Sequence, residues 1–251
     1  MKDLPVEIIL NQMKYLNLSQ LNKLCRSSER LTGICKENKK YIVNNILKQY
    51  GFTKFPSNLN YPSILKYLYQ QDYKPSAKND VFKTSAIKGH FEIVKFLVEN
   101  GADIHAYNDF ALRHSARDGY FQIVKYLVEH GADIHADDNA ALIFSYGHLE
   151  IVKYLIEHGA NIHASNDEAL RFSAHSGHLA TVKYLVEHGA NIHARNDEAL
   201  RFSAEQGHLE IVKYLVEHGA NIHAINALRN SAKYGYLEVV KYLVKNGAIN
   251  K

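Results

Sequence analysis

The chain has 251 residues, of which 46% are hydrophobic and 22% charged, close to the averages of globular proteins. These values exclude a disordered chain, a collagen and a coiled-coil rod, and the length allows one or two domains with a sizeable core. Only Cys25 and Cys35 are cysteines, which excludes a disulfide scaffold and a four-cysteine zinc site and fits a reducing compartment.

Neither a signal peptide nor a membrane span is expected. Asp3, Pro5 and Glu7 interrupt the first ten residues, where a signal peptide needs a continuous apolar stretch. The chain also lacks a run of about 18 apolar residues, the length that a membrane-spanning helix requires. We therefore expect an intracellular, cytoplasmic protein.

Charge divides the chain near residue 75. Residues 1–74 contain 12 Lys and Arg against 5 Asp and Glu, a net charge of +7, whereas residues 75–251 contain 18 against 21, a net charge of −3. The slightly acidic larger part disfavours nucleic acid as a ligand. Local support for nucleic-acid binding is confined to Lys36, Lys39 and Lys40, and such a run is usually a solvated face.

Residues 1–49 are expected to form a small helical segment. Their sequence places Leu4-Pro5-x-Glu7-Ile8 before spaced apolar residues and a Leu24-Cys25-Arg26 stretch. This order resembles the F-box, with Ser28 at the position where that family has tryptophan. The resemblance implies a surface for the small adaptor subunit of a cullin-type ubiquitin ligase, formed by Leu4, Pro5, Ile8, Ile9 and Met13. Alternatively, three amphipathic helices simply cap the repeats that follow.

Residues 50–79 are predicted to be a linker with one N-terminal capping helix. Three prolines, Pro56, Pro62 and Pro75, surround the helical stretch SILKYLYQQ. We expect this helix to shield the first repeat.

An internal repeat occupies residues 80–251. A Gly-His or Gly-Tyr pair precedes an apolar helix at Gly89, Gly119, Gly147, Gly177, Gly207 and Gly235, so that successive starts are 30, 28, 30, 30 and 28 residues apart. The first short step removes two residues from a helix end between Leu142 and Gly147, and the second removes two from a loop between Ala224 and Leu228.

Each repeat is predicted to be helix, turn, helix and loop. In HLEIVKYLVEHGANIHA, Glu210, Lys213 and Glu217 form a narrow polar stripe, so the helix needs neighbours on both flanks. Gly207 is expected in the turn between helices, and Gly219 at the helix C-terminus. Because no unit buries its apolar face alone, we expect an all-α solenoid of about six helix-turn-helix units.

The sequence GHLEIVKYLVEHGANIHA resembles the ankyrin repeat, and the resemblance covers about residues 80 to 248. Glu198-Ala199-Leu200-Arg201 replaces the family's T-P-L-H, and the loop is three residues short, so the protruding hairpin should be stubby or absent. The N-D-E-A-L-R variant is similar to the expanded ankyrin families of giant DNA viruses, which implies the host cytoplasm as the location. The resemblance implies protein binding.

An enzyme is not expected, because the sequence lacks a phosphate-binding loop, a nucleophile elbow and an H-E-x-x-H motif. Histidines recur as H-x4-H, for example His188 and His193. Zinc ligands must lie about 2.0–2.1 Å from one metal, whereas equivalent histidines in stacked repeats should be about 10 Å apart. We therefore predict that the histidines bond to backbone groups, with no metal and no cofactor.

Partner specificity should lie where the repeats differ. By resemblance, these positions line a concave face on which a protein target binds. The candidate partner-binding residues are Tyr107, Arg113, Arg117, Tyr146, Arg171, Phe172, His175, Arg195, Arg201, Phe202, Glu205, Arg229 and Lys233. Arginine beside aromatic residues is typical of binding hot spots. The alternative is that Phe172 and Phe202 only pack between repeats.

The favoured function is therefore a protein-binding ankyrin module that recruits substrates to a cullin-type ubiquitin ligase. The alternative is a plain ankyrin scaffold or decoy without a link to ubiquitin. A third hypothesis, nucleic-acid binding through the basic N-terminal part, predicts binding that weakens steeply with salt.

Overall fold

The computed structural model describes Arg30, Gly33 and residues 78–224 and 226–248. The expected F-box-like segment with its five adaptor-binding residues, and nearly all of the expected linker, lie outside this part. The described residues form twelve α-helices, α6 to α17, and no strand. The chain divides into two compact units, residues 1–103 and 104–251, which are described separately.

The first unit contributes one helix pair, α6 (Lys78–Ile87) and α7 (Phe91–Glu99). Phe82 on α6 and Leu97 on α7 are fully buried, which is expected for facing helices. The Asn79 side-chain oxygen accepts a hydrogen bond from the backbone N–H of Asp103 at 3.2 Å. This bond ties the start of α6 to the loop after α7.

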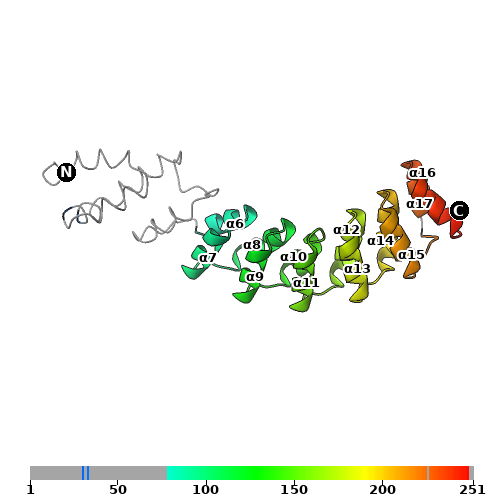
Figure 1. Cartoon of the computed structure of the whole chain (residues 1–251). Coiled ribbons are helices and arrows are strands. Elements are labelled where there is room, and N and C mark those ends of the chain that lie inside the picture. The colour runs from blue at the N-terminus through cyan, green and yellow to red at the C-terminus, as the bar shows by residue number, and fades with distance from the viewer. Residues whose placement is uncertain (1–29, 31–32, 34–77, 225, 249–251) are drawn as a thin grey trace. The chain divides into compact units, whose positions relative to one another are not determined.

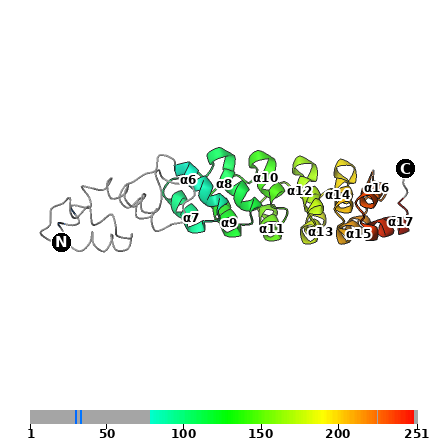
Figure 2. The ribbon, with the colours of Figure 1, turned by 90° about the horizontal axis from the view of Figure 1, so that it is seen from above.

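The second unit is a row of five helix pairs. Its helices are α8 (Ala106–Arg117), α9 (Phe121–Glu129), α10 (Ala136–Phe144), α11 (Leu149–Glu157), α12 (Ala164–His175), α13 (Leu179–Glu187), α14 (Ala194–Glu205), α15 (Leu209–Glu217), α16 (Ala227–Lys233) and α17 (Leu237–Lys245). Figures 1 and 2 show the pairs following one another, with α8, α10, α12 and α14 in one layer and α9, α11, α13 and α15 in the other. We call them the inner and outer helices. The expected all-α solenoid is confirmed.

The outer helices are amphipathic and bury the apolar side that the sequence predicts. In α15, Ile211, Val212 and Leu215 are buried, because the apolar stripe packs against neighbours on both sides. The helix ends at Gly219, whose φ is +100°. The N–H of Ala220 then donates to the carbonyl of Leu215 at 2.9 Å, which satisfies one of the free carbonyls of the last turn.

The turn glycines serve both backbone conformation and packing. Gly177 has φ +81°, and a Cβ atom added there would lie 2.7 Å from the imidazole of His208 in the next repeat. Gly207 has φ +77°, and its Cβ would lie 2.3 Å from the ring of Tyr236. The aromatic residues of four Gly-His or Gly-Tyr pairs therefore pack on the glycine of the preceding repeat, namely His148, His178, His208 and Tyr236.

Four loops of the second unit contain a left-handed turn. Three consecutive residues have positive φ in each, at residues 107–109, 137–139, 165–167 and 195–197. No strand forms in these described loops, which agrees with the expectation of a stubby or absent hairpin. In the last loop Asn226 has φ +73°, and α10 spans nine residues where α8, α12 and α14 span twelve. The two short steps thus fall in a loop and at a helix end, as predicted.

Candidate functional site: the inner-helix surface

An aromatic row follows the inner helices. It consists of Phe144, Phe172 and Phe202 at equivalent positions of three repeats, together with Tyr146 and His175. Phe144 is 41% exposed, and Phe172 and Phe202 are half-buried. The ring of Tyr146 packs edge-on against Phe172 with centroids 5.9 Å apart, and His175 packs against Phe202 at 5.3 Å. Phe172 and Phe202 therefore both contact the preceding repeat and keep accessible surface.

The inner-helix arginines have a structural task that the sequence reasoning did not anticipate. Arg171 is 2% exposed, and its Nε and Nη2 donate to the carbonyls of Asn166 and Ser165, each at 3.0 Å. Its Nη1 forms an ion pair with Glu198 of the next repeat. Arg171 therefore fastens the left-handed turn and offers a partner almost no surface.

Arg113 and Arg201 occupy the equivalent positions. Arg113 donates to the carbonyls of Asn108 at 2.9 Å and Tyr107 at 3.1 Å, and it pairs with Asp137 at 2.6 Å. Arg201 donates to the carbonyl of Arg195 at 3.2 Å. Both side chains are half-buried, so a partner could reach only part of each guanidinium.

The remaining predicted residues are accessible to different degrees. Exposed side chains belong to Tyr107, Arg117, His175, Arg195, Arg229 and Lys233, and half-buried ones to Tyr146, Phe172, Phe202 and Glu205. Arg117 pairs with Asp118 at 2.8 Å, and this hydrogen bond lowers the pKa of the Asp118 carboxyl. Glu205 accepts a hydrogen bond from Asn230 at 3.1 Å, which joins α14 to α16.

A ladder of buried carboxylate and amide side chains connects the repeats, and sequence reasoning missed it. The third residue of each left-handed turn is buried: Asp109, Asn139, Asp167 and Asp197. Its Oδ1 accepts a hydrogen bond at 2.8 Å from a backbone N–H of the next repeat, at Asp133, Asn161, Asn191 and Asn221 respectively. An Asp or Asn recurring just before each A-L motif was the available signal.

Several histidines bond to backbone carbonyls, as predicted, whereas His163 and His193 contact the carboxylates of Asp167 and Asp197. Nδ1 of His158 donates to the carbonyl of Tyr154 at 2.7 Å, and His188 repeats this bond on Tyr184. Nε2 of His208 reaches the carbonyl of His175 in the preceding repeat at 3.0 Å. Within the part of the chain that the structure describes, no three His, Cys, Asp or Glu residues are grouped so as to hold a metal ion.

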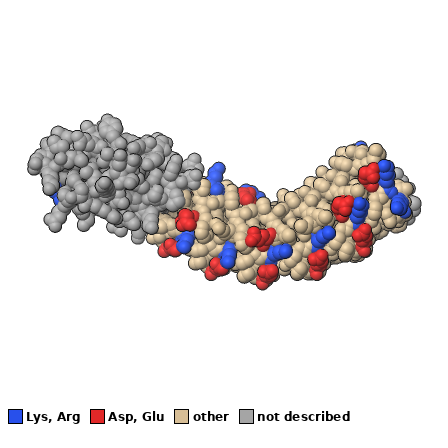
Figure 3. Space-filling model, viewed as in Figure 1, with Lys and Arg blue, Asp and Glu red and all other residues tan. Residues whose placement is uncertain are grey.

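The outer helices carry an exposed row of charged side chains. Figure 3 shows acidic and basic side chains alternating along the side of the second unit where Figure 1 places α9, α11, α13 and α15, and a largely uncharged surface beside the inner helices. Lys213 pairs with Glu210 at 2.7 Å, a typical exposed pair within one helix. The inner helices carry exposed charges of their own, such as Arg117, Arg195 and Lys233, which accompany the aromatic row.

The comparisons with known proteins agree with this architecture. A family described as "Ankyrin repeats (3 copies)" matches residues 56–138, 139–196 and 193–251. The crystal structure of the human ASB11 ankyrin repeat domain is similar with a TM-score of 0.61 and 22% sequence identity, over 68% of this chain and 85% of that one. No curated protein matches the chain. Among the described helices, none has the length and apolar character that crossing a membrane requires.

Proposed function

The chain belongs to the ankyrin repeat family, whose repeats form protein-binding modules, and on this premise we propose that it recruits a protein target on its inner-helix surface. We further propose that residues 1–49 deliver this target to a cullin-type ubiquitin ligase. The proposed location is the cytoplasm, or the host cytoplasm if the resemblance to viral ankyrin families reflects its origin.

One observation carries the first part of the proposal, the partly exposed aromatic row. Phe144 is 41% exposed on a fully helical surface, and the flanking His175 and Arg117 are exposed as well. Large aromatic side chains beside arginine dominate binding energy at protein interfaces. Because Arg171 and the buried Asp ladder hold the repeats in register, the surface is pre-organised and a partner loses little entropy in ordering it.

The second part rests on the F-box-like pattern of residues 1–49. The stretch Leu4-Pro5-x-Glu7-Ile8 supports an apolar adaptor-binding surface that also includes Ile9 and Met13. In the alternative, a plain scaffold or decoy, the same residues turn inward as a cap. An exposed apolar patch of a few hundred Å² usually marks an interface, so the two functions differ in what these side chains contact.

Affinity purification of the tagged full-length chain separates these functions. Two double variants are compared with wild type: Phe172→Ala with Phe202→Ala, and Leu4→Ala with Pro5→Ala. Quantitative mass spectrometry should show that the first loses the target and keeps the ligase adaptor, and that the second does the reverse. Melting temperatures check that both variants remain folded.

Each outcome decides part of the proposal. A wild-type chain that never retains the adaptor leaves the plain scaffold as the function. A target that binds the phenylalanine variant as well as wild type rules out the aromatic row. A convenient control is Gln122→Asp, because Gln122 is exposed on the outer helix α9 and should change neither result.

A further inference from the structure

The last outer helix exposes two apolar side chains whose equivalents in the other repeats are half-buried. Leu237 is 66% exposed and Val244 is 55% exposed, whereas Leu209 and Val216 at the same positions of the preceding repeat are half-buried. Lys241 lies between them, four residues after the first and three before the second, so all three share one face of α17. We call Leu237, Lys241 and Val244 the terminal stripe.

The interior repeats define what this face accommodates. Phe121, the equivalent of Leu237, packs edge-on against Tyr154 of the next repeat with ring centroids 5.6 Å apart. Lys183, the equivalent of Lys241, places Nζ 5.6 Å from the ring centroid of Tyr214. In both contacts the stripe meets an aromatic residue on the following outer helix. In the part that the structure describes, no helix follows α17.

Lys153 makes the same contact, with Nζ 5.4 Å from the ring centroid of Tyr184. The arrangement of a lysine over a tyrosine is thus repeated at two successive interfaces. A cation held over an aromatic face within about 6 Å is attracted by the ring quadrupole. Lys241 pairs with Glu238 of the same helix at 2.7 Å, and because its side chain is 69% exposed it can still receive an aromatic ring on the outer side of α17.

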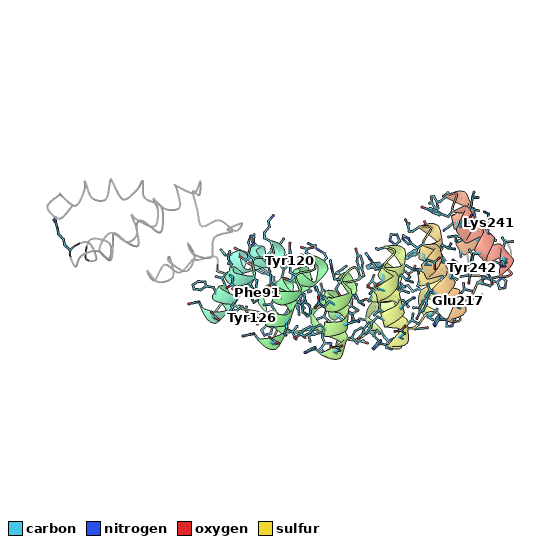
Figure 4. The ribbon with its side chains drawn as sticks, viewed as in Figure 1. Phe91, Tyr120, Tyr126, Glu217, Lys241 and Tyr242 are labelled. Carbon is cyan, nitrogen blue, oxygen red and sulfur yellow. The ribbon has the colours of Figure 1, made fainter. Side chains whose placement is uncertain are left out.

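The last repeat differs from the preceding one in charge. Lys245 and Lys233 occupy positions that Glu217 and Glu205 hold in the preceding repeat. Residues 226–248 contain four basic residues and one acidic residue, whereas residues 194–224 contain three basic residues and five acidic residues. Figure 4 shows Glu217 on α15 and Tyr242 on α17, the last two outer helices. Glu217 acts electrostatically on Tyr242 of the next repeat. In the last repeat the position equivalent to Glu217 is Lys245, the residue after Val244 of the terminal stripe.

We propose that the terminal stripe binds an acidic amphipathic helix of a partner protein. The helix packs apolar side chains on Leu237 and Val244, places an aromatic ring beneath Lys241 and directs a carboxylate to Lys245. The basic N-terminal segment, with its net charge of +7, and a second copy of the same basic face are both disfavoured by charge. This surface lies on α17 and is independent of the aromatic row.

A labelled peptide tests the proposal. The acidic probe is a stapled, fluorescein-labelled helix with the sequence of α15 in which Lys213→Glu removes its basic charge. A basic twin replaces its glutamates with lysines, and a third peptide carries Tyr214→Ala. Fluorescence anisotropy with the full-length chain should show binding of the acidic probe, and binding weaker by about tenfold or more for both other peptides.

Variants of the chain locate the binding face. Val244→Asp and Lys245→Glu should each weaken the acidic probe by about tenfold, and Lys245→Glu should gain affinity for the basic twin. Gln122→Asp, on the exposed face of α9, is the matched control and should leave binding unchanged. Because both test residues are exposed, circular dichroism should show an unchanged fold.

Three results would overturn the proposal. The first is equal binding of the acidic probe and its basic twin. The second is binding that Val244→Asp does not affect. The third is a wild-type dimer in sedimentation velocity that Val244→Asp dissociates, since a second copy would then cover the terminal stripe. None of these outcomes bears on targets held by the aromatic row.

Discussion

The repeat of α14 and α15 and the repeat of α16 and α17 have nearly the same outer helix but differ in burial. Ala204 is fully buried, whereas Ala232 at the same position of α16 is exposed. Val216 is half-buried, and Val244 is 55% exposed. Because the side chains are identical, the difference comes from the following repeat, which covers the first pair and not the second. Burial in this fold is therefore a property of the interface between repeats.

The same two repeats differ in their hydrogen bonds. Asp197 ends a left-handed turn and accepts the N–H of Asn221 in the following loop at 2.8 Å. The loop before α16 is two residues shorter, and Ala227 begins that helix directly after Asn226. The final repeat thus lacks a buried carboxylate of this kind between Asn226 and Ala248. Stability should accordingly decrease from the interior toward the last repeat.

The largest expected effect compares one buried leucine in each of these repeats. Leu215 and Leu243 are both fully buried at equivalent positions. Leu215→Ala should lower the free energy of unfolding by about 2–5 kcal/mol, as buried leucine truncations do. Leu243→Ala should cost less, because the last repeat can open while the others stay folded. Urea unfolding measures both, and Lys213→Ala is a control with little expected change. Equal losses at the two leucines would show that the repeats unfold as one unit.

The next effect separates backbone strain from packing at two glycines. Gly189 has φ +97° and no heavy atom within 4 Å of an added Cβ, whereas the Cβ at Gly177 would meet His208 at 2.7 Å. Gly189→Ala should therefore cost about 1–2 kcal/mol, the strain of a left-handed alanine. Gly177→Ala should cost more, because the imidazole must also move. Thermal unfolding of both variants gives the difference, and a larger loss at Gly189 would contradict the packing described between repeats.

A smaller effect tests the buried ladder. Asp197→Ala removes the acceptor of the Asn221 N–H and leaves that donor unsatisfied, which should cost about 1–3 kcal/mol. Asp197→Asn keeps the acceptor oxygen and should retain most of the stability, because Asn139 makes the same bond in another repeat. Denaturant unfolding with both variants is the measurement. If alanine and asparagine behave alike, the hydrogen bond contributes nothing and the ladder is only a packing feature.

The parts of the fold that depend on local chemistry could be predicted from the sequence. Gly219 marks a helix end because a left-handed residue is needed there, and the apolar spacing of α15 identifies its buried side. The two short steps between repeats placed the shortening of α10 and of the last loop correctly. These features follow from the residue and its near neighbours in sequence.

The candidate site was harder to predict because its residues act across repeats. Arg171 has hot-spot composition, yet its guanidinium bonds to the turn carbonyls five and six residues before it and is buried. Asp167 belongs to the recurring N-D-E-A-L-R stretch, but it accepts an N–H from a residue 24 positions later. The spacing of apolar residues along the helices predicts neither role. From the sequence, Phe172 and Phe202 either bind a partner or pack between repeats, and the structure shows that each packs on the preceding repeat while staying half-buried.

The smallest expected effect is a loss of stability in acid that originates between repeats. Burial lowers the pKa of His178, and the neighbouring His148 and His208 in the adjacent repeats lower it further by like-charge repulsion. Burial also lowers the pKa of His114. A lowered pKa means that the unfolded chain binds more protons than the folded one below about pH 6.5. These histidines therefore contribute stability above that pH, and the contribution is lost as the pH falls toward 5.

The loss of stability in acid comes from repulsion between imidazolium groups and from their desolvation. Broken hydrogen bonds are not the cause, because a protonated imidazole still donates to the carbonyl that His208 contacts. The denaturant midpoint should be lower at pH 5 than at pH 7.5, and His178→Gln should reduce this difference. His158→Gln is the control, since His158 is exposed on the outer side and outside the row of His148, His178 and His208. A midpoint that stays constant from pH 7.5 to 5, or an equal response of the two variants, would remove the histidine row as the origin of acid sensitivity.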